Sequence, residues 1–109
     1  MADASTYFDD VKKYASGFNE AACTKIVKHL GIALRNRDSS LVSCSDKSEL
    51  DRVREKWCRK KLELPHTDAE LDAVIASVCE MMKGDRSKSR VTFYYLVAEK
   101  TGKLDVLAG

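Results

Sequence analysis

Apolar side chains recur at helical spacing along most of the chain, so that each stretch presents one apolar face. Polar residues typical of helix ends separate these stretches. The pattern predicts five helices, at about residues 5–15, 20–35, 47–62, 68–83 and 91–102. We therefore predict an all-α fold, a compact single-domain bundle of about five helices that spans residues 1–109.

Two helix starts carry the sequence pattern of a capping box. Pro65 cannot continue a helix because it lacks an N–H group. Thr67 and Glu70 then have the spacing at which each side chain bonds the backbone N–H group of the other. Asp46 and Glu49 repeat this pattern one helix earlier. We expect helices to begin just after Asp46 and just after Thr67.

Gly31 is a common stop signal, but the apolar stripe of residues 22–34 continues past it. We therefore expect the second helix to run through Gly31 to about Arg35, although glycine costs a helix about 1 kcal/mol relative to alanine. Outside the helices, residues 41–42 are expected to tuck inward as a turn. The tail at residues 104–107 is expected to pack loosely against the bundle.

Residues 91–98 (VTFYYLVA) are ambiguous, because β-branched and aromatic side chains favour a strand. No other segment of the sequence has the pattern of a partner strand, and a lone strand leaves its backbone groups unsatisfied. We therefore predict a helix with Ser87 or Ser89 as N-cap. Such a helix, apolar almost all round, belongs at the centre of the bundle or in an oligomer contact.

Trp57 shares one face of the third predicted helix with Leu50 and Val53. Stacking of nucleic-acid bases would require Trp57 and the aromatic residues 93–95 to be exposed beside basic side chains. Because these residues lie on apolar helix faces, we expect them to pack in the protein core instead. We predict that Trp57 is buried in the core.

The formal net charge of +2 gives no strong preference for an anionic partner, but the charge is uneven. Residues 47–64 hold seven Lys/Arg against four Asp/Glu. Within them, Arg52, Lys56 and Arg59 recur at i, i+4 and i+7, roughly opposite the apolar face. Such a stripe can lie along nucleic-acid phosphates, although interleaved acidic residues make a solvated helix face the commoner explanation.

A second candidate site is the loop at residues 35–40 (RNRDSS). Arg35 and Arg37 can bind a phosphate or carboxylate in a bidentate manner. The same residues also suit an ordinary helix exit, with Asp38 pairing locally and a serine capping the next turn. We favour this structural interpretation and keep both arginines as candidate anion-binding residues.

The four cysteines lie far apart and never form a C-x-x-C pair: Cys23, Cys44, Cys58 and Cys79. The first residues are acidic and polar, unlike a signal peptide, and no apolar run approaches the ~20 residues that span a bilayer. We therefore expect a cytoplasmic location, no membrane association and four free thiols. The spacing also argues against a zinc site, and we predict no metal or cofactor.

Catalytic motifs are absent from the sequence. A dyad of Cys58 and His66 is conceivable but has no supporting signature, and His29 has no motif partner. A glycine-rich phosphate loop is also missing. We assign no catalytic residue.

Three runs of sequence are more specific than general helix patterns: residues 10–14 (DVKKY), 26–40 (IVKHLGIALRNRDSS) and 89–96 (SRVTFYYL). In these runs the chain resembles DUF2853, a bacterial family of small proteins of unknown function. The resemblance covers nearly the whole chain and implies a short cytoplasmic bacterial protein that stands alone. It implies no activity and no functional residues.

Together these features predict a small binding or interaction module without catalysis, whose partner is an unidentified protein or a second copy of itself. The alternative is a nucleic-acid-associated protein that uses the basic helix around residues 52–61. A small enzyme without a recognisable motif is the third hypothesis.

Overall fold

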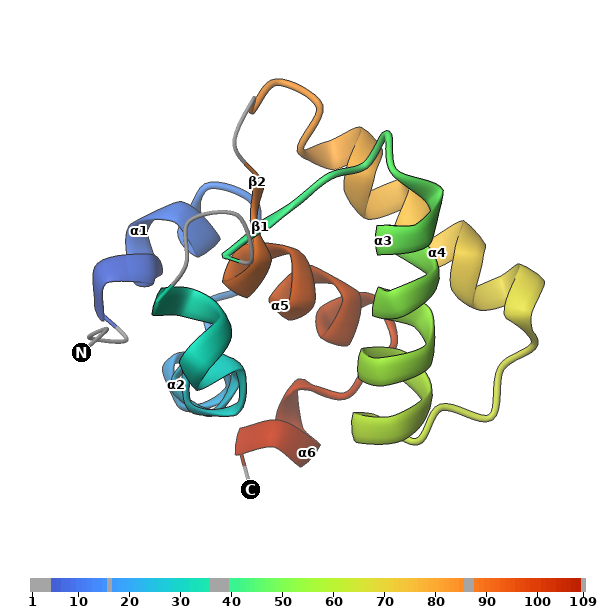
Figure 1. The fold of residues 1–109 in the computed structure, drawn as a ribbon. Coiled ribbons are helices and arrows are strands. Elements are labelled where there is room, and N and C mark those ends of the chain that lie inside the picture. The colour runs from blue at the N-terminus through green and yellow to red at the C-terminus, as the bar shows by residue number, and fades with distance from the viewer. Residues whose placement is uncertain (1–4, 16, 36–39, 86–87, 109) are drawn as a thin grey trace.

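The computed structural model describes residues 5–15, 17–35, 40–85 and 88–108. Its elements follow one another in the order shown in Figure 1. They are α1 (Ser5–Lys12), α2 (Glu20–Leu30), the 3₁₀-helix η1 (Gly31–Arg35), β1 (Leu41–Val42), α3 (Lys47–Arg52), the π-helix η2 (Val53–Lys61), α4 (Asp68–Met81), β2 (Lys88–Ser89), α5 (Arg90–Lys100) and α6 (Leu104–Ala108). The predicted all-α fold is confirmed.

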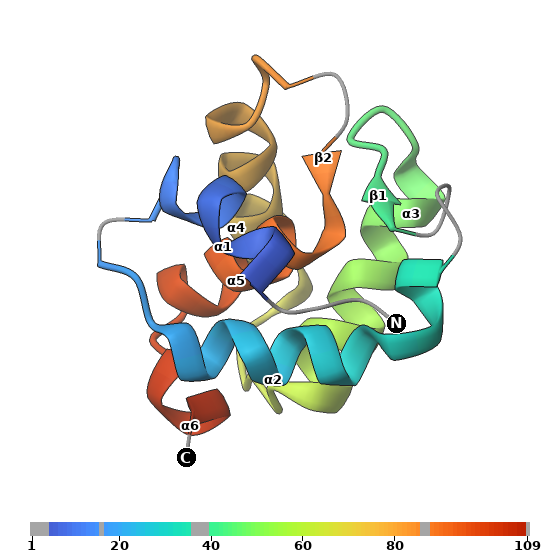
Figure 2. The same ribbon diagram turned by 90° about the vertical axis from the view of Figure 1, so that its left-hand side faces the viewer.

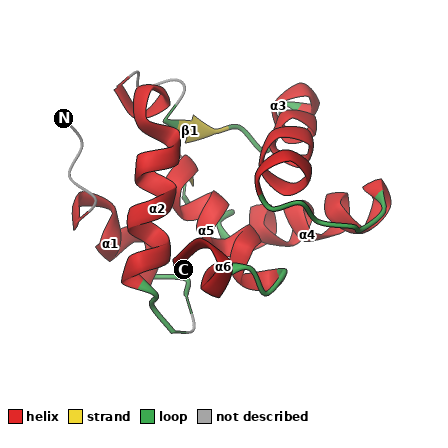
Figure 3. Ribbon diagram, turned by 90° about the horizontal axis from the view of Figure 1, so that it is seen from below, coloured by secondary structure: helices red, strands yellow, loops and turns green. Residues whose placement is uncertain are grey.

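Helix α5 lies at the centre, and every residue from 91 to 98 is buried. Helices α1 and α2 cover it on one side, η2 and α4 cover the other, and α6 packs near its end (Figures 1 and 3). The predicted helix at residues 91–98 is thus confirmed. Burial on all sides overrides the local strand propensity because it hides the apolar and aromatic side chains from water on every face.

The start of α5 is fixed by the chain around it. Ser89 occupies the predicted N-cap position, but its side chain makes no capping hydrogen bond. Instead, the backbone N–H group of Arg90 donates to the carbonyl oxygen of Ser40 at 2.8 Å. A tertiary hydrogen bond therefore helps to position this terminus.

Strands β1 and β2 form a two-residue antiparallel pair, in which Leu41 faces Ser89 and Val42 faces Lys88 (Figure 2). The expectation of a simple turn at residues 41–42 was wrong, because these residues pair as a short strand. The inward position was correct, since Val42 is buried. The two segments are far apart in sequence, so their pairing depends on the packing of the helices between them.

Gly31 changes the type of helix without ending the helical path. Asn19 caps α2, because its Oδ1 accepts from the N–H group of Ala22 at 3.0 Å. The α-helix ends at Leu30, and Gly31 has a φ of +30°, in the region that favours glycine. The chain then continues as η1 to Arg35. The prediction of one uninterrupted α-helix was therefore wrong at Gly31.

The third predicted helix is continuous but changes its winding, from α-helical in α3 to π-helical in η2. The N–H group of Leu62 bonds the carbonyl oxygen of Trp57, five residues back, at 2.9 Å. π-winding turns the chain less per residue than an α-helix and shifts which side chains share a face. Trp57, Cys58 and Leu62 are buried along this run.

One capping box is complete and the other is not. Thr67 and Glu70 bond each other's backbone N–H groups at 2.9 and 3.2 Å, as predicted. Asp46 also caps its helix, but Glu49 does not return a hydrogen bond to it. Glu49 is buried and ion-paired with Arg90 and Arg52 instead.

The Glu49–Arg90 ion pair joins α3 to the start of α5 inside the protein. The two residues are only 8 % and 7 % exposed. The Arg90 guanidinium also donates to the carbonyl oxygen of Leu41 at 3.1 Å and to the Tyr94 hydroxyl at 3.2 Å. Removing one partner of such a pair typically costs about 3–5 kcal/mol, because a buried charge is left uncompensated.

The prediction of four free thiols was wrong, since Cys44 and Cys79 form a disulfide. Their Cα atoms are 5.9 Å apart, although 35 residues separate them in the sequence. Spacing along the chain could not reveal this pair, because packing α4 against the rest of the bundle creates it. Cys23 and Cys58 are free and buried.

Trp57 is completely buried, as predicted. Its indole N–H group donates to the carbonyl oxygen of Tyr94 at 3.1 Å, and its ring stacks on the Tyr94 ring with centroids 4.6 Å apart. The tail also belongs to the fold. It forms α6, which packs on α2 and buries Leu107, whereas Val106 stays 65 % exposed.

We predict that Trp57→Ala lowers the free energy of unfolding by about 3–5 kcal/mol, because it leaves a large cavity in the core. Chemical denaturation measures this value. Trp57→Phe is the control, and it should cost less because it keeps most of the ring. A native fluorescence maximum typical of water-exposed tryptophan would contradict the burial of Trp57.

We also predict that alkylation of the unfolded protein without reductant modifies only the two free cysteines. Cys44→Ser should lower the free energy of unfolding by roughly 2–4 kcal/mol, since the disulfide no longer restricts the unfolded chain. Reductant should destabilise the natural protein similarly and leave Cys44→Ser unchanged. Four modified cysteines would show that the bond is absent.

Candidate anion-binding site

The predicted basic stripe on the third helix is largely neutralised by ion pairs. The guanidinium of Arg52 lies 2.9 Å from Oε2 of Glu49. Arg59 donates through Nε to Oδ1 of Asp68 at 3.2 Å, and this bond lowers the pKa of the Asp68 carboxyl. Arg52 and Arg59 are therefore engaged within the protein.

Arg54 extends this network toward α4. It donates to Glu55 at 2.8 Å and to Asp72 at 3.0 Å, and these hydrogen bonds raise its pKa. Arg54 and Arg59 thus face carboxylates of α4 and connect η2 to that helix. Each exposed pair contributes less than about 1 kcal/mol, so the network orients the two helices more than it stabilises them.

The second predicted site lies mostly outside the described residues. Arg35 is exposed at the end of η1. Arg37 and the rest of residues 36–39 fall outside the described ranges. Anion binding by Arg35 and Arg37 therefore stays a prediction.

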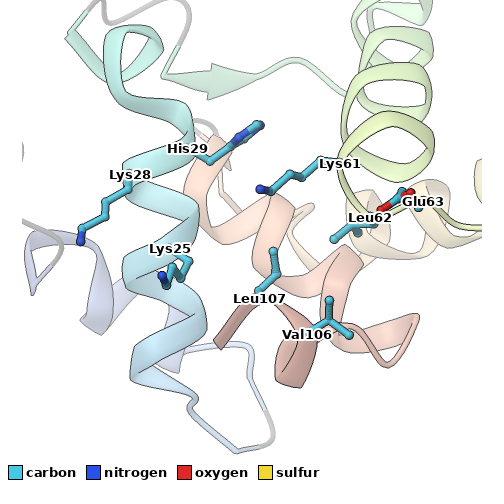
Figure 4. A pocket seen from close by; sticks show the side chains of 8 residues that line it. All are labelled: Lys25, Lys28, His29, Lys61, Leu62, Glu63, Val106 and Leu107. Atoms are coloured by element: carbon cyan, nitrogen blue, oxygen red, sulfur yellow. The ribbon is translucent and has the colours of Figure 1, made fainter. Parts of the chain in front are cut away.

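The lysines gather elsewhere, around a pocket of about 620 Å³ between α2, the end of η2 and α6 (Figure 4). We call it the lysine pocket. It is lined by Lys25, Lys28, His29, Lys61, Leu62, Glu63, Val106 and Leu107. Figure 4 shows His29 and Lys61 pointing toward each other from opposite helices, with Leu107 below them and Lys28 turned to the other side of α2.

A second hollow of about 450 Å³ adjoins the first and shares His29 and Lys61 with it. We call it the side pocket. Its other lining residues are Lys56 and Lys60. Lys56 is the one member of the predicted basic stripe that lines either hollow.

The charge of these hollows is almost entirely positive. In the described part of the chain, the lysines that form ion pairs are Lys13, Lys47 and Lys83, all outside the two hollows. Glu63 is the acidic residue that lines the lysine pocket. A concave surface lined by one sign of charge raises the local concentration of oppositely charged ligands.

Local structure explains how the site is built. Lys25 and His29 stand at i and i+4 on α2 and so share the helix face that lines the pocket. On the opposite wall, η2 ends at Lys61, and Glu63 adopts a φ of +52°, which is uncommon for a residue with a side chain. The chain turns sharply there, beside α6.

His29 stands at the junction of the two hollows. Partial burial lowers the pKa of its imidazole, and the positive charge of Lys61 lowers it further. The centroid of its imidazole ring lies 5.3 Å from the centroid of the Trp57 ring. Sequence reasoning found no role for His29 or Lys25, although their shared helix face was a readable signal. The opposite wall of the pocket, at residues 61–63, could not be predicted from the sequence, because its position depends on how η2 packs.

The described residues support neither the Cys58–His66 dyad nor a metal site. Burial raises the pKa of the Cys58 thiol to about 11, so a nucleophilic dyad with His66 is not supported. Within the described ranges, no cluster of three or more His, Cys, Asp or Glu could hold a metal ion. None of the helices in these ranges is long and apolar enough to cross a membrane.

A comparison with curated proteins finds no match to this chain. A comparison with family models does find a match. The model of DUF2853, described as a protein of unknown function, matches residues 6–105. The match covers almost the whole chain and agrees with the three sequence runs that resemble this family. The protein therefore belongs to the DUF2853 family.

Proposed function

We propose that this protein is a binding module without catalysis and that its ligand is a small anion held in the lysine pocket and the side pocket. The observation that carries the proposal is the gathering of lysines around two adjoining hollows. These residues are Lys25, Lys28, Lys56, Lys60 and Lys61.

The chemistry of lysine supports an anionic ligand. An ammonium group is a compact charge with three hydrogen-bond donors, and its bonds to phosphate or carboxylate oxygens are stronger than bonds between neutral groups. The volumes of the two hollows fall within the range of small-molecule sites. An acidic segment of a partner protein, or of a second copy of this chain, would offer the same chemistry.

Nucleic-acid binding is the weaker hypothesis. Arg52 and Arg59, two of the three stripe residues, already pair with carboxylates. A duplex would have to displace those carboxylates before it could contact the arginines. Lys56 and the other lysines lie in hollows, which suit a compact ligand better than a rigid double helix.

The proposal includes a cytoplasmic location. Two free, buried thiols, Cys23 and Cys58, suit a reducing compartment, whereas the Cys44–Cys79 disulfide is more typical of an oxidising one. Cell fractionation of the tagged protein tests the location directly. Recovery with secreted or periplasmic markers would contradict it.

We predict that pyrophosphate binds and shifts the NMR signals of His29 and the neighbouring backbone of α2. Lys61→Gln should weaken binding at least about tenfold, because Lys61 lines both hollows and a charge-assisted hydrogen bond is worth about 1.5–3 kcal/mol. Lys83→Gln is the matched control, since Lys83 is an exposed lysine that lines neither hollow and pairs with Glu80. Shifts spread evenly over all surface lysines would contradict a specific site.

Nucleic-acid binding has its own test. If Arg52, Lys56 and Arg59 each contact a phosphate of duplex DNA, log affinity should fall with log salt at a slope of about −2.7. We expect no gel shift at physiological salt, and little effect of changing all three residues to glutamine. A clear shift that this triple variant abolishes would favour the nucleic-acid hypothesis over ours.

A further inference from the structure

We infer that the ligand is a phosphate monoester with a small apolar body, whose phosphate lies in the side pocket and whose body lies in the lysine pocket. This inference rests on the proposed function and adds the class of ligand. It follows from the different linings of the two hollows.

The side pocket suits a multiply charged group. Lys56, Lys60 and Lys61 line it together with His29, and no carboxylate is among the residues that line it. The three positive charges of these ammonium groups exceed the single negative charge that a carboxylate ligand would bring. A phosphate monoester carries nearly two negative charges near pH 7 and three acceptor oxygens, so it matches three lysines better.

The lysine pocket has an apolar floor that a free inorganic anion would leave unused. Leu62 and Leu107 line this floor, and Val106 stands beside them on α6. Figure 4 shows Leu107 beneath the space between His29 and Lys61, with Val106 farther down on α6, below Leu62. An apolar group of the ligand placed here would lie directly next to a phosphate in the side pocket, because both hollows share His29 and Lys61.

The exposure of Val106 gives independent support. Among the described residues, the large apolar side chains that stand exposed are Val106, at 65 %, and Met81, at 37 %. Val106, the more exposed of the two, is one of the residues that line the lysine pocket. Covering it with the apolar body of a ligand would remove this apolar surface from water, which favours binding.

The test compares three probes by calorimetry: phenyl phosphate, inorganic phosphate and phenol. We expect phenyl phosphate to bind at least about tenfold more tightly than inorganic phosphate, because burial of the ring adds to the ionic contacts. Phenol should not bind measurably. Equal affinities for the two phosphates would overturn the inference and leave the proposed function standing, whereas failure of every anion to bind would overturn both.

Two variants locate the two halves of the ligand. Val106→Ser should reduce the affinity for phenyl phosphate to nearly that for inorganic phosphate, while the latter stays unchanged. Lys60→Gln should weaken both probes by a similar factor. Met81→Ser is the matched control, because it removes the other exposed apolar side chain, on α4. An unchanged preference for phenyl phosphate in Val106→Ser would show that the ring does not lie on α6.

Two further probes distinguish the biological sources of such a ligand. Adenosine monophosphate represents nucleotides, and hexyl phosphate represents lipid phosphates. If either probe binds more tightly than inorganic phosphate, and Val106→Ser removes this difference in affinity, the result supports the inference and identifies the source. If neither binds more tightly than inorganic phosphate, the apolar floor does not select the ligand, and the inference is wrong.

Discussion

The burial of α5 from Arg90 to Ala98 is the constraint on which the rest of this structure depends. A helix that is apolar on all faces cannot lie at a surface, so it must be covered from every direction. Helices α1, α2, α4 and α6 and the η2 run supply that cover. Short elements are enough for this purpose, because each has to hide only one apolar face against α5.

The polar contacts then fix how the covering elements sit around α5. Arg90, at its first turn, pairs with Glu49 of α3 and bonds the carbonyl oxygen of Leu41 in β1. The Cys44–Cys79 disulfide links the segment after β1 to α4. Buried ionic groups are costly to leave unpaired, and a disulfide permits only a narrow range of distances. Together these contacts favour one arrangement of elements that hydrophobic burial alone would leave less defined.

The candidate site follows from the same arrangement. Helix η2 lies between α4 and α2, and its two kinds of basic residue meet different neighbours. Its arginines face the carboxylates of α4, where planar guanidinium groups form paired hydrogen bonds. Its terminal lysines face α2, which presents Lys25 and His29, together with α6. Charge is therefore neutralised on one side of the helix and concentrated on the other.

The sequence by itself determined the five main helical segments, the cap at Thr67 and the burial of Trp57, because helical periodicity and capping depend on neighbouring residues only. It also determined that residues 91–98 form a helix, since no other segment of the sequence has the pattern of a strand that could pair with them. Only the tertiary structure decided the Cys44–Cys79 bond, the β1–β2 pair and the use of Glu49 as a partner of Arg90. The lysine pocket belongs to this second group. Each of these features joins residues that are distant in the chain, and their contact depends on how the helices pack around α5.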